Sequence, residues 1–282
     1  MPELPEVEVV RSGLSRLVVG TTISHVRIHH ARSVRRNVGD LCVQLDGATI
    51  EGVSRRGKYM WLDLDRPCVL MIHLGMSGQI RINDAPSGHP HVRLGWNVVR
   101  EGQPLRYFEF LDQRTFGGMQ ICDRDQDGEP AAISHIARDP FDPLFDVDKF
   151  SDVLMKRSTQ VKRALLDQNL MSGIGNIYAD ECLWRVGLDG ATPCDQLDKP
   201  IIAEIVTAVT RVMNEALVAG GTSFDALYVN VNGESGYFSR SLSVYGREGE
   251  PCGRCGNPII RSKFMNRSSF HCLTCQPPWL LP

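Results

Sequence analysis

The chain has 282 residues, of which 42% are hydrophobic and 23% are charged, with 26 glycines and 16 prolines. These proportions are those of an ordinary soluble globular protein, and they exclude an intrinsically disordered chain and a collagen-like repeat. Charges interrupt every apolar run before the roughly 18 residues that a membrane span needs, and the acidic beginning of the chain predicts no signal peptide.

The net charge of −2 hides an uneven distribution along the chain. Residues 101–152 hold twelve acidic and five basic side chains, whereas residues 26–58 hold seven basic and three acidic ones, and residues 240–282 hold six basic and two acidic ones. Two basic segments beside an acidic one can give a surface with one strongly positive side. Charge alone leaves two interpretations open, a nucleic-acid-binding surface or solvated faces spread around the molecule.

The first half of the chain predicts one helix followed by a β-rich domain. Apolar residues recur at helical spacing from Val7 to Leu17, and Gly20 ends the pattern. From residue 21 to about residue 121, short alternating stretches separated by Gly, Asp and Asn predict strands. We expect a β-sandwich or flattened barrel with one leading helix, and the acidic, proline-bearing stretch 123–149 is typical of a linker.

The second half predicts a helical domain. Apolar residues indicate helices within 153–166, from about Asn176, and within 201–213. Residues 221–278 are rich in Gly, Ser and Asn, and they end in a module with paired cysteines. The fold class that these patterns predict is α+β.

The cysteine module predicts a metal site. Cys252-Gly-Arg-Cys255 and Cys272-Leu-Thr-Cys275 are two CxxC pairs separated by sixteen residues. Four thiolates at this spacing suit one tetrahedral, structural Zn²⁺ ion, because a closed four-cysteine site leaves no open position for catalysis. The alternatives are a redox dithiol and a chance occurrence of the two pairs. The odd total of nine cysteines favours a reducing cytosol, and we interpret the other five as buried small hydrophobic residues: Cys42, Cys68, Cys122, Cys182 and Cys194.

The segment between the two cysteine pairs alternates like a β-hairpin. It carries three cations, Arg261, Lys263 and Arg267. A metal-stapled hairpin that presents cations is suited to binding phosphate groups or a nucleic-acid groove.

Pro2 follows the initiator Met, and removal of that Met would leave a secondary amine at the N-terminus. An α-amino group has a pKa of about 7.7–8.0, against about 10.4 for Lys, so far more of it is uncharged at neutral pH. A secondary amine that attacks an aldehyde-level sugar carbon forms an iminium ion, and Glu3 could protonate the opening sugar. The alternative is structural, since Pro2 and Pro5 could simply begin a helix with acids at its positive end.

Five motifs occur here in the order found in one family: PELPEVE from Pro2, GKY at 57–59, HLGMSG at 73–78, SGIGNIYADE at 172–181 and the zinc hairpin. From Pro2 to Cys275 the chain resembles the formamidopyrimidine-DNA glycosylase family, which also contains endonuclease VIII. The resemblance implies an N-terminal helix with a β-sandwich or flattened barrel, a helix-two-turns-helix domain and a zinc β-hairpin. The expected segments are a catalytic β-sandwich domain at 1–135, an acidic linker at 136–150, a helical DNA-binding domain at 151–246, and the zinc hairpin and tail at 247–282.

The resemblance implies a bifunctional enzyme of base excision repair. Such an enzyme excises 8-oxoguanine and formamidopyrimidines from damaged double-stranded DNA through a Schiff base, and then cleaves the strand by β,δ-elimination. The matching catalytic residues are the nucleophile Pro2, the acid Glu3, the supporting carboxylate Glu6, the β-strand lysine Lys58 and, for δ-elimination, Arg267.

Three side chains match those with which the family fills the gap left by an extruded base: Met76, Arg114 and Phe116. Extrusion costs a few kcal/mol of lost stacking and pairing, which an inserted apolar side chain partly offsets. Many relatives read DPRRFG where this chain reads DQRTFG from Asp112 to Gly117. The loss of one Pro and one Arg affects the expected rigidity of the loop and its preference for the opposite base.

The resemblance also implies contacts with the DNA backbone. Glycines in Gly173-Ile174-Gly175-Asn176 let the backbone approach a phosphate closely at the start of a helix. The residues expected to bind DNA, besides the three gap-filling side chains, are His89, His91, Arg157, Lys162, Asn176 and Lys263.

Residues 221–237 form a long, polar, glycine-rich segment that in formamidopyrimidine-DNA glycosylases covers the extruded base. This segment favours oxidised purines as substrates. Two alternatives are an endonuclease VIII-like enzyme for oxidised pyrimidines and a non-catalytic DNA-binding paralogue, which the presence of the catalytic residues disfavours. We expect a monomer in the bacterial cytoplasm, associated with the nucleoid. The tail from Gln276 to Pro282 has no functional interpretation.

Overall fold

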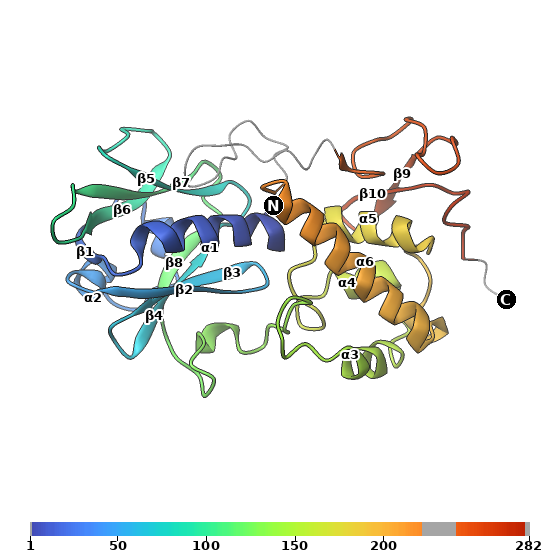
Figure 1. Cartoon of the computed structure of the whole chain (residues 1–282), viewed down its shortest axis with the longest axis horizontal. Coiled ribbons are helices and arrows are strands. Elements are labelled where there is room, and N and C mark those ends of the chain that lie inside the picture. The colour runs from blue at the N-terminus through green and yellow to red at the C-terminus, as the bar shows by residue number, and fades with distance from the viewer. Residues whose placement is uncertain (1, 222–240, 280–282) are drawn as a thin grey trace. The chain divides into compact units, whose positions relative to one another are not determined.

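The computed structural model describes residues 2–221 and 241–279. The chain forms two compact units, one made of Met1–His135 with Ala219–Tyr237 and one made of Ile136–Val218 with Phe238–Pro282 (Figure 1). Helices and antiparallel sheets together confirm the α+β class. Within the described ranges, no helix is long and apolar enough to cross a membrane. The finer division into four segments stays a prediction.

Helix α1 (Leu4–Val18) opens the first unit, and its boundaries follow from local chemistry. Glu3 is the N-cap and forms a capping box with Glu6, which satisfies backbone donors that the first turn leaves open. Pro5 lies in the first turn, where a missing N–H costs nothing. Apolar residues at helical spacing from Leu4 to Val18 are buried, so the helix packs one face into the core.

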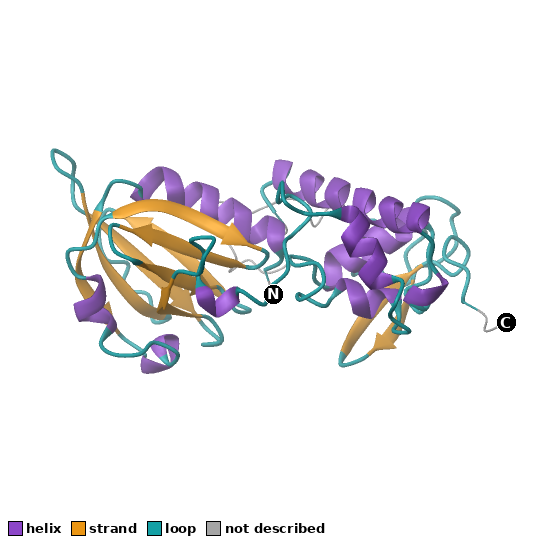
Figure 2. Cartoon of the chain, turned by 90° about the horizontal axis from the view of Figure 1, so that it is seen from below, coloured by secondary structure: helices purple, strands orange, loops and turns teal. Residues whose placement is uncertain are grey.

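Eight strands of the first unit form two four-stranded antiparallel sheets, drawn in orange in Figure 2. The first sheet has the order β1 (Thr22–Ile28), β6 (Val92–Val99), β7 (Arg106–Asp112) and β5 (Gly78–Asn83). The second has the order β2 (Ile50–Arg56), β3 (Tyr59–Leu64), β4 (Cys68–His73) and β8 (Gly118–Asp123). The predicted β-sandwich with a leading helix is confirmed.

One apolar core joins α1 to both sheets. Trp96 of β6 and Phe108 of β7 face each other in register and stack with ring centroids 3.7 Å apart. Both rings are almost fully buried, and burying a large apolar side chain contributes about 1.5–3 kcal/mol.

Short helical segments interrupt the stretch in which the sequence predicts only strands. They are η1 (Ala31–Val34) and α2 (Leu41–Leu45), and a further short segment, η2 (Ala131–Ile133), lies in the stretch predicted as a linker. Asp40 begins α2 by accepting a hydrogen bond from the Cys42 backbone N–H at 2.8 Å. Segments of five residues or fewer are too short for hydrophobic periodicity to indicate them.

The second unit is helical and ends in a two-stranded hairpin, as the sequence predicts. Its helices are α3 (Val147–Leu154), α4 (Val161–Leu165), α5 (Asn176–Val186) and α6 (Lys199–Val218), with the short η3 (Cys194–Gln196). The hairpin consists of β9 (Ile260–Phe264) and β10 (Arg267–His271). Helix α3 begins inside the stretch expected to be a linker, because Asp146 caps it by accepting from the Lys149 N–H at 3.0 Å.

Candidate active site and nucleic-acid interface

The N-terminal end of α1 brings together three of the predicted catalytic residues. Pro2, Glu3 and Glu6 are all buried. The Glu6 carboxylate accepts a hydrogen bond from the Glu3 backbone N–H at 2.9 Å. Gly221 lies next to this pair, because a Cβ added to it would stand 3.5 Å from the Glu6 Cγ. Beyond Gly221, the segment 222–237 that we expect to cover an extruded base lies outside the described residues.

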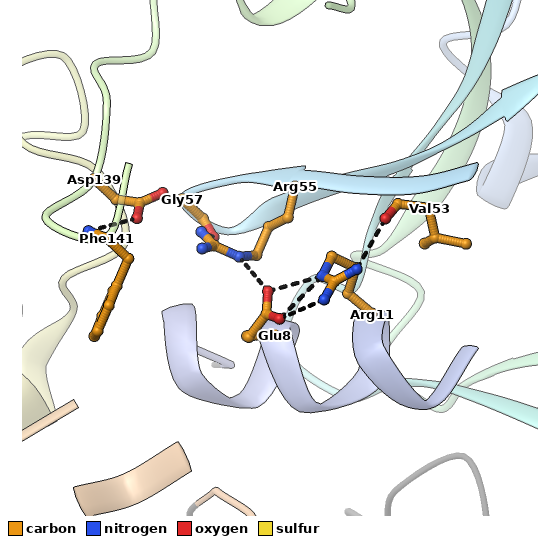
Figure 3. A network of polar contacts seen from close by, with 7 residues as sticks. All are labelled: Glu8, Arg11, Val53, Arg55, Gly57, Asp139 and Phe141. Atoms are coloured by element: carbon orange, nitrogen blue, oxygen red, sulfur yellow. Dashed lines mark hydrogen bonds and ion pairs between the residues drawn. The ribbon is translucent and has the colours of Figure 1, made fainter. Parts of the chain in front are cut away.

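A network of charged side chains ties α1 to the turn between β2 and β3 (Figure 3). Lys58 lies in this turn, directly after Gly57. Glu8 accepts hydrogen bonds from Arg11 and from Arg55, the latter at 3.0 Å between Nε and Oε2. Arg55 in turn donates to the Gly57 carbonyl at 3.1 Å. Burial opposes the charge on Glu8, but the two guanidinium groups hold its pKa below the ordinary value. The buried Lys58 therefore lies in a turn that is anchored to the helix bearing the N-terminus.

His73 lies close to Lys58 because the β3–β4 register pairs Tyr59 with His73. The Tyr59 and His73 rings are 4.9 Å apart. Burial, followed by the positive charges of Arg36 and Lys58, lowers the pKa of His73 to about 4. A neutral imidazole beside Lys58 can donate or accept a proton or a hydrogen bond. His73 is the first residue of the HLGMSG motif, and this place in the motif is its signal in the sequence, although the sequence predicts no role for the side chain.

Met76, Arg114 and Phe116, hereafter the wedge residues, are exposed on two neighbouring loops of the first unit. Met76 is 41% exposed and Phe116 is 42% exposed. The Arg114 guanidinium lies 5.4 Å from the centre of the Phe116 ring. Large apolar side chains exposed together at loop tips are typical of a binding surface and not of a core.

His89 and His91 flank Pro90 on a segment adjoining the same loops. Their rings are 5.4 Å apart, and the His89 ring accepts a hydrogen bond from the His91 backbone N–H at 3.2 Å. Arg93 contacts the His91 ring at 3.2 Å and donates to the Asp112 carbonyl at 2.7 Å. The structure thus connects the predicted His-x-His site to the strand end from which one wedge loop departs.

In the second unit, the hairpin tip and the start of α4 form one cationic groove. Arg267 lines the groove together with Lys156, Arg157 and Arg163. The volume of the groove is about 680 Å³. Arg157 is paired with Asp167 at 2.8 Å and remains 38% exposed. Lys263 is exposed on β9 of the same hairpin. A groove lined by four cations fits the phosphates of a nucleic acid.

Lys162 and Asn176 differ from the predicted phosphate contacts. Lys162 is only 1% exposed, and its Nζ lies 2.6 Å from a carboxylate oxygen of Asp180, so its burial does not favour the predicted contact with DNA, which stays a prediction. The Asn176 amide donates to the Ser268 carbonyl at 2.8 Å. Asp180 also accepts from the Phe270 N–H at 2.9 Å. Both side chains therefore hold the hairpin, Lys162 from a fully buried position and Asn176 from a half-buried one.

The four cysteines of the two CxxC pairs converge. Their sulfur atoms all lie within 4.8 Å of one another, and among the described residues this is a cluster that could hold a metal ion. Burial would raise the pKa of Cys252, but hydrogen bonds from the Arg254 and Cys255 backbone N–H groups and the Trp184 indole lower it to about 6. Thiolate is the form that binds a metal.

Comparison with known proteins gives concordant matches. A model of the formamidopyrimidine-DNA glycosylase N-terminal domain matches residues 1–119, and a model of the H2TH domain of the same enzyme matches residues 136–227. The chain is 54% identical to the formamidopyrimidine-DNA glycosylase of Mycobacterium avium, over 98% of this chain and 99% of that protein. It is 52% identical to the same enzyme of Mycolicibacterium vanbaalenii, over 98% and 99%.

Solved structures agree with these matches. The Lactococcus lactis Fpg in complex with DNA containing an abasic site is similar, with a TM-score of 0.87 and 32% identity over 98% of this chain and 100% of that one. The MutM (Fpg) protein of Thermus thermophilus has a TM-score of 0.84 and 34% identity, over 98% of each chain. A complex of the Lactococcus enzyme with DNA containing an oxidised pyrimidine has a TM-score of 0.87, with 32% identity over 98% and 100%.

Proposed function

We propose that Pro2 is the nucleophile of this chain, which belongs to the formamidopyrimidine-DNA glycosylase family. The chain is a DNA glycosylase of base excision repair with AP-lyase activity. The N-terminal amine, once Met1 is removed, attacks C1′ of the damaged nucleotide. The base leaves, the C1′–O4′ bond opens with protonation of the ring oxygen, and an iminium ion forms. Removal of a C2′ proton then sends the electrons of that C–H bond towards the iminium, and the 3′ phosphate leaves. Arg267 assists the second elimination at the other side of the nucleotide.

The arrangement at the start of α1 is the observation that carries this proposal. Glu3 and Glu6 are buried next to Pro2 in the chain. The Glu3 carboxyl group can protonate the opening sugar, and the Glu6 carboxylate holds Glu3 in place by accepting a hydrogen bond from its backbone N–H. Lys58 lies in the turn held by Arg55, and we propose that it contacts phosphate and donates a proton during elimination.

We propose that the wedge residues fill the gap left in the duplex when the damaged nucleotide is extruded. Arg114 can hydrogen-bond the unpaired partner base, while Met76 and Phe116 supply apolar surface. The backbone contacts are proposed to come from His89, His91, Arg157, Lys263 and Arg267. The exposed cations around the groove of the second unit support this assignment.

The four-cysteine site fits one structural Zn²⁺ ion. Four soft thiolate donors within 4.8 Å of one another suit tetrahedral zinc and leave no position open for substrate. We propose that the ion holds the hairpin that carries Arg267. Since one extruded nucleotide needs one site, we propose that the enzyme acts as a monomer, at the bacterial nucleoid.

Oxidised purines, 8-oxoguanine and formamidopyrimidines, are the proposed substrates, because the segment 221–237 corresponds to the one that covers the base in this family. Oxidised pyrimidines are the second candidate, since a similar enzyme has been solved with DNA containing one. A panel of duplexes with 8-oxoguanine or thymine glycol distinguishes the two. Faster single-turnover excision of thymine glycol would reverse the proposed preference.

Borohydride reduction during reaction with an 8-oxoguanine duplex tests the nucleophile. We expect one covalent protein–DNA complex whose peptide map places the DNA on residue 2. Pro5→Ala is the matched control, because it changes the nearby proline in the first turn of α1 and keeps the N-terminal amine. An adduct on another residue, or mature active enzyme with a blocked N-terminus, contradicts the mechanism.

A further inference from the structure

The wedge residues stand on two loops whose backbones touch. Loop 74–77 connects β4 to β5 and carries Met76, whereas loop 113–117 connects β7 to β8 and carries Arg114 and Phe116. Gly75 has a φ of +66°, and a Cβ at this position would lie 2.4 Å from the Gly117 nitrogen. No side chain fits between the loops, so a shift of one loop must move the other.

One buried carboxylate joins the two loops chemically. Asp112 is fully buried, and its Oδ1 accepts a hydrogen bond from the Ser77 hydroxyl at 2.6 Å. The same oxygen accepts from the Arg114 N–H at 3.2 Å, and Oδ2 accepts from the Gly117 N–H at 2.7 Å. The Ser77 Oγ also accepts from the Arg114 N–H at 3.0 Å. These bonds link Ser77 of the first loop to both ends of the second.

The backbone of Asp112 is held as firmly as its side chain. Its N–H donates to the His91 carbonyl at 3.0 Å, and its carbonyl accepts from the Arg93 Nε at 2.7 Å. The carboxylate therefore stands on a fixed strand end. This loop has Gln113 where many relatives have proline, so the hydrogen bonds to Asp112 hold it without the φ restriction that a proline adds.

We infer that Asp112, acting with Ser77, is a positioning residue that fixes the distance between Met76 on one loop and Arg114 with Phe116 on the other. The inference rests on the proposed function, in which these side chains enter the duplex together. Three side chains can fill one gap only if their spacing matches it, and a displacement of about 1 Å can cost about 100-fold in rate. Asp112 itself touches no DNA in this role, because it is buried.

Kinetics of the zinc-loaded, full-length enzyme test the inference. Asp112→Asn keeps the shape but offers one acceptor oxygen in place of two, so it breaks part of the link. Ser77→Ala removes the hydroxyl, and Ser77→Thr restores it. Ser54→Ala is the matched control, because the Ser54 hydroxyl makes an equivalent bond to Asp63 at 2.8 Å, between β2 and β3 of the same unit.

The expected result is a split between two steps. Single-turnover excision of 8-oxoguanine opposite cytosine should fall about 10- to 100-fold in Asp112→Asn and Ser77→Ala, while cleavage of a preformed abasic site changes less than about threefold. Fluorescence of 2-aminopurine beside the lesion should show incomplete insertion. Ser77→Thr and Ser54→Ala should match wild type. The double variant that combines Asp112→Asn with Ser77→Ala should excise no more slowly than Asp112→Asn alone.

Comparison with Phe116→Ala separates this inference from the proposed function. If Phe116→Ala slows excision but Asp112→Asn and Ser77→Ala do not, the loops hold their spacing without the carboxylate and the inference is wrong. If Phe116→Ala itself has no effect on excision, the role of the wedge residues in the proposed function is wrong. Equal losses in excision and in abasic-site cleavage would indicate general damage and would also overturn the inference.

Discussion

The charge state of His73 shows how neighbours in space control a single residue. His73 ends β4, and the cations Lys58, Arg35 and Arg36 approach it from β3's leading turn and from the segment after η1. Burial and these charges favour the neutral ring and lower its pKa to about 4 from 6.5. The first unit thus carries a neutral imidazole beside Lys58, the proposed proton donor, at every pH near neutrality.

This shift predicts the pH dependence of stability. Because the unfolded chain binds a proton near pH 6.5 and the folded ring only near pH 4, His73 stabilises the fold above pH 6.5, and this contribution is lost as the pH falls towards 4. At pH 4.5 the loss is about 2–3 kcal/mol. Urea unfolding of wild type and His73→Gln at pH 7 and pH 4.5 should show a smaller decrease for the variant. His25→Gln on β1 is the control and should show the wild-type decrease in unfolding free energy. An equal decrease in wild type and His73→Gln would disprove the assignment.

At the scale of the elements, the hairpin is held to α5 by polar groups. Asn176 and Asp180 lie one turn apart on α5 and bind the Ser268 carbonyl and the Phe270 N–H of β10. Lys162 of α4 completes this contact through its ion pair with Asp180, and its Nζ lies 4.7 Å from the centre of the Phe264 ring of β9. The strand that begins with Arg267 is therefore placed by α4 and α5.

This packing predicts that Lys162 supports structure and does not contact phosphate. Lys162→Met leaves the buried Asp180 without its cation, which costs about 3–5 kcal/mol of unfolding free energy. Each lost phosphate contact reduces the magnitude of the negative slope of log K against log salt by about 0.9. We expect Arg157→Gln to give a less steep slope, and Lys162→Met to leave the slope unchanged at temperatures where the variant is folded. A less steep slope in Lys162→Met would restore Lys162 to the DNA contacts.

At the scale of the whole molecule, the proposed catalytic residues come from both compact units. Pro2, Glu3, Glu6 and Lys58 belong to the first unit, and Arg267 belongs to the second. The two basic segments divide in the same way, with residues 26–58 in the first unit and the hairpin in the second. The net charge of −2 is therefore compatible with strong, salt-dependent DNA binding, because neutralisation of phosphates is local.

Removal of the metal should impair DNA binding by the hairpin of the second unit. We expect one zinc per chain, and its chelation should reduce DNA affinity at least about 10-fold, because the hairpin loses its staple. The Trp184 indole donates to the Cys252 sulfur at 3.4 Å, so its fluorescence should change on chelation. Cys42→Ser, outside the cluster, should keep the full zinc content. Apo protein that binds and cleaves DNA normally would contradict the structural role.

The sequence by itself determined the features that depend on neighbours along the chain. The helix marked by Val7 to Leu17, the alternating strands and the CxxC pairs at 252–255 and 272–275 are set by local spacing, and the ordered motifs identified the family. The periodicity of apolar residues reports which face of an element is buried, and this sufficed for the α+β class and both halves of the chain.

Only the tertiary structure decided the environment of single polar residues. Lys162 reads as an exposed cation in KRSTQVKR, yet Asp180, eighteen positions later, removes it from solvent. Asp112 reads as one acid of a loop, yet it binds Ser77 from another loop, thirty-five positions away. The pKa of His73 likewise depends on cations from separate segments. Burial and electrostatic partners are non-local, because they arise where distant segments pack, and one-dimensional spacing carries no record of that packing.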